Sequence, residues 1–303
     1  YTYSDGNGCV NSTSQNVTVN PTPIAPAVSS PQSPATAFVS DLVPSGVDIK
    51  WYDNAVGGNL LSSIDALSVG TTYYATQTLN GCESPRSNGV TVILTRTVNI
   101  HLILEGLWDR INNTNMMLEA LDGNNNYEPK WGWGIADQIQ VNLFLASDLY
   151  NPVDAQINNP IDLLTDGLAT FTVPSTINGD YYIQVRNRNH LETWSADVVS
   201  FNTGSNPVEY DFTTSADKAY AFEGGDLLPQ VMVAPGIYAF YVGDVNQDGI
   251  IDSGDFGLFS ADNEITAYGY LPTDFNGDGF VDSSDFGLLD PRITTYTYTQ
   301  RPY

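Results

Sequence analysis

The chain has 303 residues, which is enough for two or three domains with separate hydrophobic cores. It carries 35 Asp and Glu against 10 Lys and Arg, and the net charge of -25 excludes a nucleic-acid partner, because binding to phosphates depends on Lys and Arg. The sequence contains no run of about 18 apolar residues that could insert into a membrane.

The segment 1–20 is repeated later in the chain. Gly8-Cys9 matches Gly81-Cys82 and Val17 matches Val90, both at the same offset. A constant offset of this size predicts a β-module of about 70 to 80 residues. We expect residues 1–23 to hold the closing hairpin of one copy and a Pro-rich linker, and residues 24–96 to hold a complete copy. Because residue 1 falls inside a strand-like pattern, the sequence is expected to be a mature product or a fragment.

Inside the complete copy, the segment 48–53 (DIKWYD) predicts a central strand whose Trp51 points into a core. The segment 71–94 then predicts two strands around a turn at Asn80-Gly81.

Residues 97–240 predict a second β-sandwich. Strand-like patterns occur between Gly/Asn/Asp-rich turns, at 98–108, 138–146, 169–174, 180–189 and 238–242. The chain therefore belongs to the mostly β class. Its two histidines, His101 and His190, lie in separate strand-like segments, and no Gly-x-Ser-x-Gly motif occurs, so we expect no enzymatic activity. Trp131 and Trp133 in WGWG (131–134) are either packing residues or a stacking platform for a sugar ligand.

The strongest motif lies in residues 241–303. Two twelve-residue segments, 244–255 (DVNQDGIIDSGD) and 274–285 (DFNGDGFVDSSD), repeat one another. Calcium takes oxygen ligands from loop positions 1, 3, 5, 7, 9 and 12, and a glycine at position 6 allows the sharp turn. Position 6 is Gly249 in one segment and Gly279 in the other. The predicted ligands of two calcium ions are Asp244, Asn246, Asp248, the Ile250 carbonyl, Asp252 and Asp255, then Asp274, Asn276, Asp278, the Phe280 carbonyl, Asp282 and Asp285.

Residues 241–290 contain eleven acidic residues and no Lys or Arg, so two bound cations would relieve their repulsion. We expect the ions to be structural, and the subdomain to unfold without them. A short helix is expected after each loop, with the second one cut short by Pro291. The apolar residues expected to face a small core are Phe256, Leu258, Phe259, Phe286, Leu288 and Leu289.

The pieces KWY, GTTYYATQTLNGCESPR and VTV resemble the Ig-like repeats of Bacteroidetes surface proteins exported by the type IX secretion system. The resemblance covers residues 24–96 and part of 1–20. It implies a disulfide from the NGC turn to an earlier Cys of the same module. Ser29-Ser30-Pro31 occupies that region here, so Cys82 is expected to be unpaired or to pair with Cys9.

The two loops, with Asp rather than Glu at position 12, resemble those of type I dockerins. In that family Ser253-Gly254 and Ser283-Ser284 would help to contact a cohesin. Segments 181–196 and 208–213 are similar to a domain that precedes such loops in Bacteroidetes exported proteins.

Together these features predict a secreted, calcium-stabilised structural or adhesive surface protein, such as a filament or stalk component. Its partners would be neighbouring modules of the same or another copy, a surface protein or a glycan. The alternative is a carbohydrate- or cohesin-binding attachment module of a larger secreted enzyme.

Overall fold

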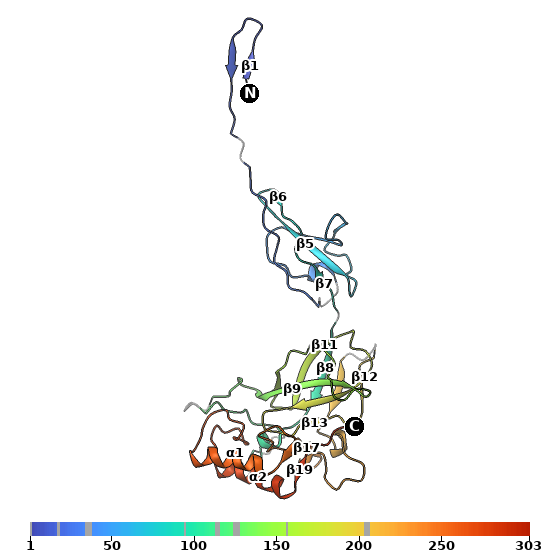
Figure 1. The fold of residues 1–303 in the computed structure, drawn as a ribbon, viewed down its shortest axis with the longest axis vertical. Helices are drawn as coiled ribbons and strands as arrows, with labels where there is room; N and C mark the ends of the chain where they lie inside the picture. Colours follow the sequence, from blue (N-terminus) through green and yellow to red (C-terminus); the bar gives the residue numbers. More distant parts are fainter. Residues whose placement is uncertain are drawn as a thin grey trace. The chain divides into compact units, whose positions relative to one another are not determined.

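The computed structural model describes residues 2–16, 19–33, 38–93, 95–112, 116–123, 128–155, 157–202 and 207–303. The chain divides into two compact units, residues 1–94 and 95–303 (Figure 1). Strands dominate the described residues, which confirms the mostly β prediction, and two twelve-residue α-helices lie in the second unit. Within the described residues, no helix is long and apolar enough to cross a membrane.

The first unit holds a hairpin and a five-stranded sheet of order β4-β3-β5-β6, with β7 beside β5. Its elements are β1 (Thr2–Ser4), β2 (Val10–Ser12), the 3-10 helix η1 (Val39–Asp41), β3 (Ile49–Tyr52), β4 (Leu60–Leu61), β5 (Thr72–Leu79), β6 (Cys82–Glu83) and β7 (Val90–Thr91).

The core of the five-stranded sheet confirms the prediction for Trp51, which is buried together with Tyr73, Ala75 and residues of β7. The turn between β5 and β6 is formed by Asn80 and Gly81, both at positive φ, which matches the twist of a tight hairpin.

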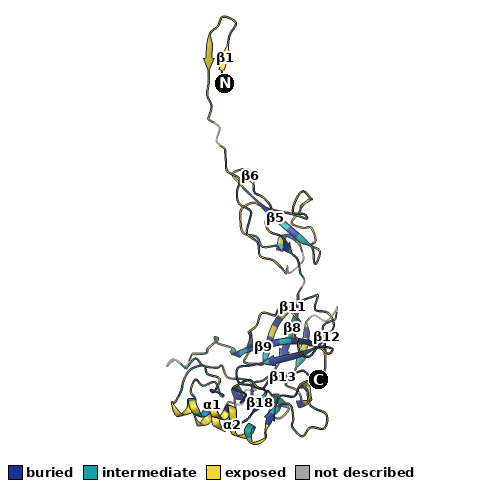
Figure 2. Cartoon of the chain, viewed as in Figure 1, coloured by how far each residue is buried: buried dark blue, intermediate teal, exposed yellow. Residues whose placement is uncertain are grey.

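Both strands of the hairpin β1–β2 are exposed at every residue (Figure 2). The repeat anchor Val17 lies outside the described residues. Both Cys9 and Cys82 are free, so of the two alternatives the structure has the unpaired one.

The second unit contains one eight-stranded sheet of order β13-β12-β9-β10-β11-β8-β15, with β14 beside β12. Its strands are β8 (Thr95–His101), β9 (Ile135–Leu145), β10 (Ile161–Leu164), β11 (Leu168–Pro174), β12 (Asp180–Arg186), β13 (Thr193–Trp194), β14 (Val199–Ser200) and β15 (Val208–Asp211). The 3-10 helices η2 (Glu105–Leu107) and η3 (Ala216–Lys218) and the hairpin β16 (Val231–Ala234) and β17 (Ile237–Ala239) complete this part.

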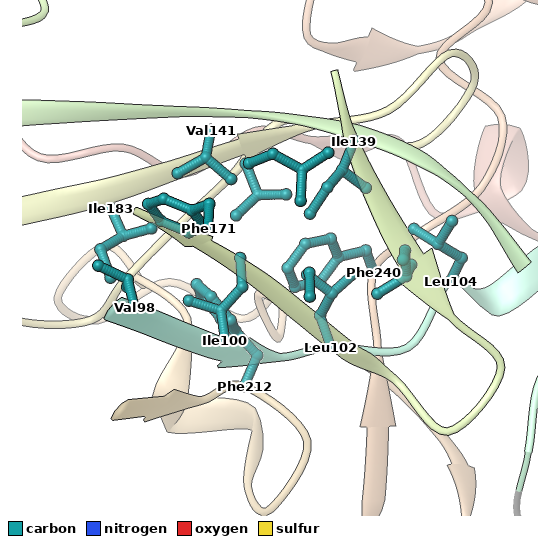
Figure 3. Close-up of a cluster of buried hydrophobic side chains, with 14 of the residues drawn as sticks. Val98, Ile100, Leu102, Leu104, Ile139, Val141, Phe171, Ile183, Phe212 and Phe240 are labelled. Atoms are coloured by element: carbon teal, nitrogen blue, oxygen red, sulfur yellow. The ribbon is translucent and has the colours of Figure 1, made fainter. Parts of the chain in front are cut away.

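Strand β9 joins two halves of this sheet. Its first part pairs with β10 and its second part, from Gln140 to Leu145, pairs with β12. A strand that switches between sheets forms the corner of a sandwich. Side chains from both halves meet in one core, where Val141 and Ile183 approach Val98 and Phe171 (Figure 3).

Residues 241–303 belong to the same compact unit as this sheet. They form β18 (Ile250–Ile251), α1 (Ser253–Glu264), α2 (Ser283–Thr294) and β19 (Thr297–Tyr298). Together with Leu191 they form a second, smaller core of Tyr241, Val242, Ile251, Phe259, Phe275, Val281 and Leu289.

Candidate metal centre

The two loops predicted to bind calcium share the same backbone bends. Gln247 and Gly277, at position 4, have φ of 58° and 74°, and Gly249 and Gly279, at position 6, have φ of 86° and 84°. Glycine adopts this left-handed conformation without steric cost. The repeat in the sequence is therefore also a repeat in the backbone.

The aspartate at position 12 anchors the start of each loop. Oδ1 of Asp255 accepts the backbone N–H groups of Val245 (2.8 Å) and Asn246 (3.2 Å), and Oδ2 accepts that of Asp252 (2.9 Å). Asp285 makes the three equivalent bonds at 2.7, 3.0 and 3.0 Å. Since each carboxylate oxygen has two lone pairs, these bonds leave both residues able to bind a cation.

The aspartate at position 1 has an oxygen without a partner. Oδ2 of Asp244 accepts the N–H of Gly249 (3.2 Å), and Oδ2 of Asp274 accepts that of Gly279 (3.1 Å). Oδ1 of both aspartates is buried and has no hydrogen-bond partner. An unpaired buried carboxylate oxygen is costly, and a cation in the loop is the kind of partner that would offset this cost.

The pKa values of the aspartates at positions 1 and 12 also indicate a cation site. Burial raises the pKa of Asp244 and of Asp274 to about 7, and the neighbouring carboxylates of Asp255 and Asp285 act in the same direction on these pKa values. Burial also raises the pKa of Asp285 to about 6 and that of Asp255 above its ordinary value. A divalent cation would favour the ionised form of all four groups.

The remaining ligand positions lie along the loop and at the helix start. Oδ1 of Asn246 accepts the N–H of Asp248 (2.9 Å), and Oδ1 of Asp248 accepts that of Ile250 (3.0 Å). Asp252 caps helix α1 by accepting the N–H of Gly254 (2.6 Å). The second loop repeats these bonds at Asn276, Asp278, Phe280, Asp282 and Ser284.

The residues at position 7, Ile250 and Phe280, lie in short pairings that cross between the repeats. Ile250 of β18 pairs with Tyr298 of β19, after α2, and Phe280 bridges to Tyr268, after α1. Tyr268 and Tyr298 occupy equivalent positions of the two repeats. The segment after each helix therefore supports the other loop.

The loops hold the right ligand types without forming a closed cage. Within the described residues, no group of three or more His, Cys, Asp and Glu side chains is gathered tightly enough to hold a metal ion. In each loop the position-5 carboxylate accepts a bond from the position-3 amide, at 2.8 and 3.0 Å, and position 9 caps a helix. Since calcium takes amide and backbone oxygens as well as carboxylates, the chemistry of this donor set fits calcium.

Two expectations about the helices were wrong. Helix α2 does not stop at Pro291 but continues to Thr294, as long as α1, and the carbonyl of Pro291 accepts the N–H of Thr295 (3.1 Å). Of the six apolar residues expected in the core, only Phe259 and Leu289 are fully buried. Leu288 is partly buried, and Phe256, Leu258 and Phe286 are exposed, although the rings of Phe256 and Phe286 pack against that of Phe259. A short helix packed on one side can bury only one stripe of residues.

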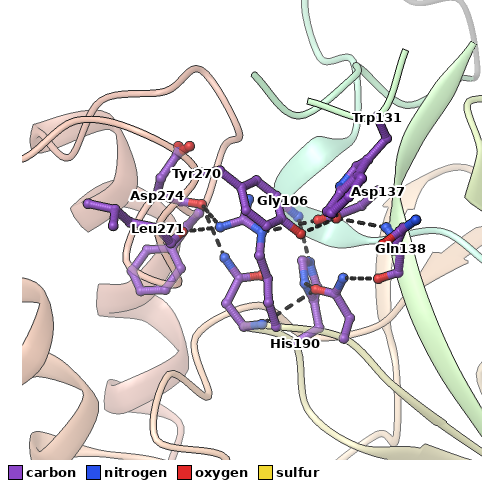
Figure 4. A network of polar contacts seen from close by, with 12 residues as sticks. Gly106, Trp131, Asp137, Gln138, His190, Tyr270, Leu271 and Asp274 are labelled. Carbon is purple, nitrogen blue, oxygen red and sulfur yellow. Dashed lines mark hydrogen bonds and ion pairs between the residues drawn. The ribbon is translucent and has the colours of Figure 1, made fainter. Parts of the chain in front are cut away.

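The segment 187–190 holds both loops against the sheet (Figure 4). The guanidinium of Arg188 donates to the carbonyls of Leu271 and Asp274, and the amide of Asn189 also donates to Asp274 (3.1 Å). The Asn189 carbonyl accepts the N–H of Gly243, next to the first loop (2.8 Å). One short segment therefore fixes the start of each loop.

His190 has a structural role in this segment. Its Nε2 accepts the N–H of Gly106 (3.2 Å), and Nδ1 lies 2.8 Å from Oδ1 of Asn187. Burial and the positive charge of Arg188 hold the pKa of His190 well below its ordinary value, so the ring is neutral. His101 lies in β8 as a partly buried strand residue.

A buried ion pair ties helix α2 to the sheet unit. Glu105 is 2% exposed and accepts bonds from Arg292 at 2.6 and 3.1 Å, as well as from the N–H of Val242 (3.2 Å). This contact joins residues 187 positions apart, and nothing in the local sequence around either residue indicated it.

The two tryptophans of WGWG have different environments. Trp131 is partly buried, and its indole N–H donates to Oδ1 of Asp137 (3.2 Å). Trp133 is 76% exposed. The tryptophans therefore do not form one platform.

The fold and these loops define a modular β-protein, in which an Ig-like module is followed by a sheet unit that carries paired loop–helix repeats. Residues 21–95 match the family model of an Ig-like domain, CHU_C associated, and this segment is accordingly an Ig-like domain. No curated protein matches the chain significantly.

Two solved type II cohesin–X-dockerin complexes from Acetivibrio cellulolyticus, a C-terminal and an N-terminal interface mutant, each contain a similar chain. The identity is 13% in both, the match covers 67% of this chain and 97% of the other, and the TM-scores are 0.37 and 0.35. TM-scores this low do not establish a shared fold.

Proposed function

We propose that this chain is a secreted, non-catalytic surface protein in which loops 244–255 and 274–285 bind two calcium ions. The ions stabilise the second unit, and the protein has a structural or adhesive role, as part of a stalk or filament on a Bacteroidetes cell with type IX secretion. The Ig-like segment supports the modular, extracellular assignment.

The observation that carries the calcium assignment is the pair of buried oxygens, Oδ1 of Asp244 and of Asp274, each without a partner at position 1 of its loop. A single orphaned carboxylate oxygen would be an isolated defect. Two of them, at equivalent positions of loops with matching backbone bends, correspond to a shared ligand requirement. Carboxylate, amide and carbonyl donors select a hard cation such as calcium over zinc or copper.

Calcium bound at the loops would also stabilise the sheet, because the two are joined by buried polar contacts. The carbonyl of Asp274 is held by Arg188 and Asn189, and Glu105 binds Arg292 on helix α2. A ligand that binds only the folded state stabilises it by mass action, about 2.7 kcal/mol per site at a free concentration of 100 times Kd. Calcium should therefore stabilise the whole of residues 95–303.

Thermal unfolding of the full chain in calcium and in excess chelator tests this function. We expect chelation to lower the Tm of the second unit by about 10 °C or more, since each kcal/mol corresponds to about 2–4 °C in a unit of this size. Limited proteolysis in chelator should cut within residues 244–285. Glu264→Gln is the control, because it removes one exposed acidic charge outside both loops and should keep the full calcium response. An equal Tm in calcium and chelator would contradict the proposal.

A further inference from the structure

A cavity of about 390 Å³ lies where the sheet meets the loops, within the range of about 300–1,000 Å³ typical of small-molecule sites. It is formed between β9, β12 and the segments that enter the two loops. The residues that line it are Trp131, Gln138, Ile139, Gln140, Pro160, Arg186, Asn187, Arg188, Gln247 and Tyr270.

One wall is a rigid aromatic corner (Figure 4). The rings of Trp131 and Tyr270 lie 5.5 Å apart at an interplanar angle of 88°. Both rings are fixed from behind by Asp137, which accepts the indole N–H (3.2 Å) and the tyrosine hydroxyl. Aromatic side chains that are already immobilised bind a ligand at low entropic cost.

The other wall is rich in amides, and part of its hydrogen-bonding capacity is unused. Gln140 is exposed, and among the described residues its side chain has no hydrogen-bond partner. Nε2 of Gln247 donates to the carbonyl of Asp244 (2.6 Å), which leaves its Oε1 able to accept another donor. Side-chain amides of this kind both donate to and accept from hydroxyl groups.

The arginines that line the cavity are paired within the protein, and the ammonium of Lys130 lies 5.5 Å from the centroid of the Trp131 ring and 5.7 Å from that of the Tyr270 ring. Arg188 forms an ion pair with Asp137 (3.1 Å) and donates to two backbone carbonyls. Arg186 lies 3.6 Å from Glu192. The lining therefore combines one aromatic corner, side-chain amides and paired arginines. Such a surface suits an uncharged, polyhydroxylated ring, whose hydroxyl groups the amides can bind.

We propose that this cavity binds a neutral saccharide, with a sugar ring against the indole of Trp131 and its hydroxyl groups bonded to Gln140 and Gln247. The volume accommodates about one or two sugar rings. This inference deepens the adhesive role proposed above and rests on it, because it names the ligand class through which the protein attaches. Trp133, which is 76% exposed and does not line the cavity, has no part in the site.

The test is calorimetric titration of the calcium-loaded full chain with a panel of neutral disaccharides: cellobiose, maltose, xylobiose and N,N'-diacetylchitobiose. We expect at least one of them to bind, and Trp131→Ala to abolish that binding. Gln140 is exposed, and its side chain has no hydrogen-bond partner among the described residues. Gln140→Ala should therefore weaken the affinity for the sugar by about five- to tenfold, which corresponds to the loss of about one hydrogen bond. Trp133→Ala is the matched control and should bind like the wild type.

Three results would overturn the saccharide site. The first is the absence of binding by every disaccharide of the panel at tens of millimolar, and the second is binding that Trp133→Ala removes while Gln140→Ala leaves it intact. A peptide or digalacturonate that binds at this cavity while the neutral sugars do not would also overturn it. The calcium-dependent Tm is measured on the same samples. A retained calcium shift without sugar binding rejects only the saccharide site, whereas an absent shift rejects the calcium assignment.

Discussion

The two loops have the same ligand chemistry but different surroundings. In the first, Asn246 and Asp248 are exposed, and the loop borders a polar cavity of about 440 Å³ that also includes Arg301. In the second, both middle glycines are buried, and the carbonyl of Gly277 accepts the N–H of Leu121 (2.8 Å). The same twelve-residue motif therefore serves once at the surface and once as a joint with the sheet.

The residue at position 4 reflects this difference. A Cβ at Gly277 would come within 2.4 Å of the Leu107 side chain. The first loop has Gln247 at this position, with a similar left-handed backbone conformation. The second loop has glycine here because Leu107 of η2 and Ala120 pack against it. We infer that the second loop is the more rigid of the two and contributes more to the stability of residues 95–303.

Among the variants considered, Arg188→Met should lower the free energy of unfolding the most. It would leave Asp137, whose side chain is 1% exposed, without its ionic partner, and would remove one of the two side chains that donate to the carbonyl of Asp274 in the second loop. Loss of one partner of a buried pair costs about 3–5 kcal/mol. Urea unfolding measures this loss, and Arg110→Met, at a pair that is 46% exposed on the arginine side, should cost about 1 kcal/mol or less. Equal costs would contradict the special role of the second loop.

Gly277→Ala should have the next largest effect and lower the free energy of unfolding by about 2–4 kcal/mol. The new Cβ would clash with the buried Leu107, and the left-handed backbone disfavours alanine. Gln247→Ala at the equivalent position of the first loop should cost about 1 kcal/mol, the bond to the Asp244 carbonyl. Chemical denaturation of both variants gives the comparison. If Gln247→Ala cost as much as Gly277→Ala, the asymmetry between the loops would be wrong.

Asp274→Asn and Asp244→Asn separate the metal's effect from that of burial. Without calcium, each change removes a carboxylate with an unpaired buried oxygen and should raise stability by about 1–2 kcal/mol. In calcium, each should instead lower the Tm, because one site is lost, and Asp274→Asn should lower it more. A change of the same sign in both buffers would contradict the role of these residues as ligands.

The pH dependence of stability is an effect in which the two loops should behave alike. Burial raises the pKa of Asp244 and Asp274 from 3.8 to about 7 in the folded state. Between these values the folded, metal-free chain keeps protons that the unfolded chain has released, so stability falls as pH rises from 3.8 to about 7. Calcium should oppose this trend, since it requires ionised ligands. Melting curves across this range, with and without metal, check both signs.

The sequence predicted local features well. The proposed loop ligands are contiguous in the chain, so their prediction needed only local spacing, and the tight turn at Asn80-Gly81, which the structure contains, was equally local. The strand β10 was missed because its four residues, Ile161–Leu164, are too short to show a pattern. Pro291 was read as a helix end, although tertiary packing carries α2 past it.

The joint between loops and sheet could not be predicted. Arg188 reaches Asp274 across 86 residues, and Glu105 reaches Arg292 across 187, so neither contact has a signature in local sequence. The same holds for the cavity, because Tyr270 approaches Trp131 only after the loops have packed on the sheet. In the sequence, Arg188 lay within the strand-like segment 180–189 and had no other signal.

The central claim is that the loops bind calcium, and calorimetric titration of metal-free full chain with calcium chloride tests it most directly. We expect two ions per chain, and one ion for each single variant Asp244→Asn and Asp274→Asn. A folded wild-type chain that binds no calcium at millimolar concentration would contradict the claim.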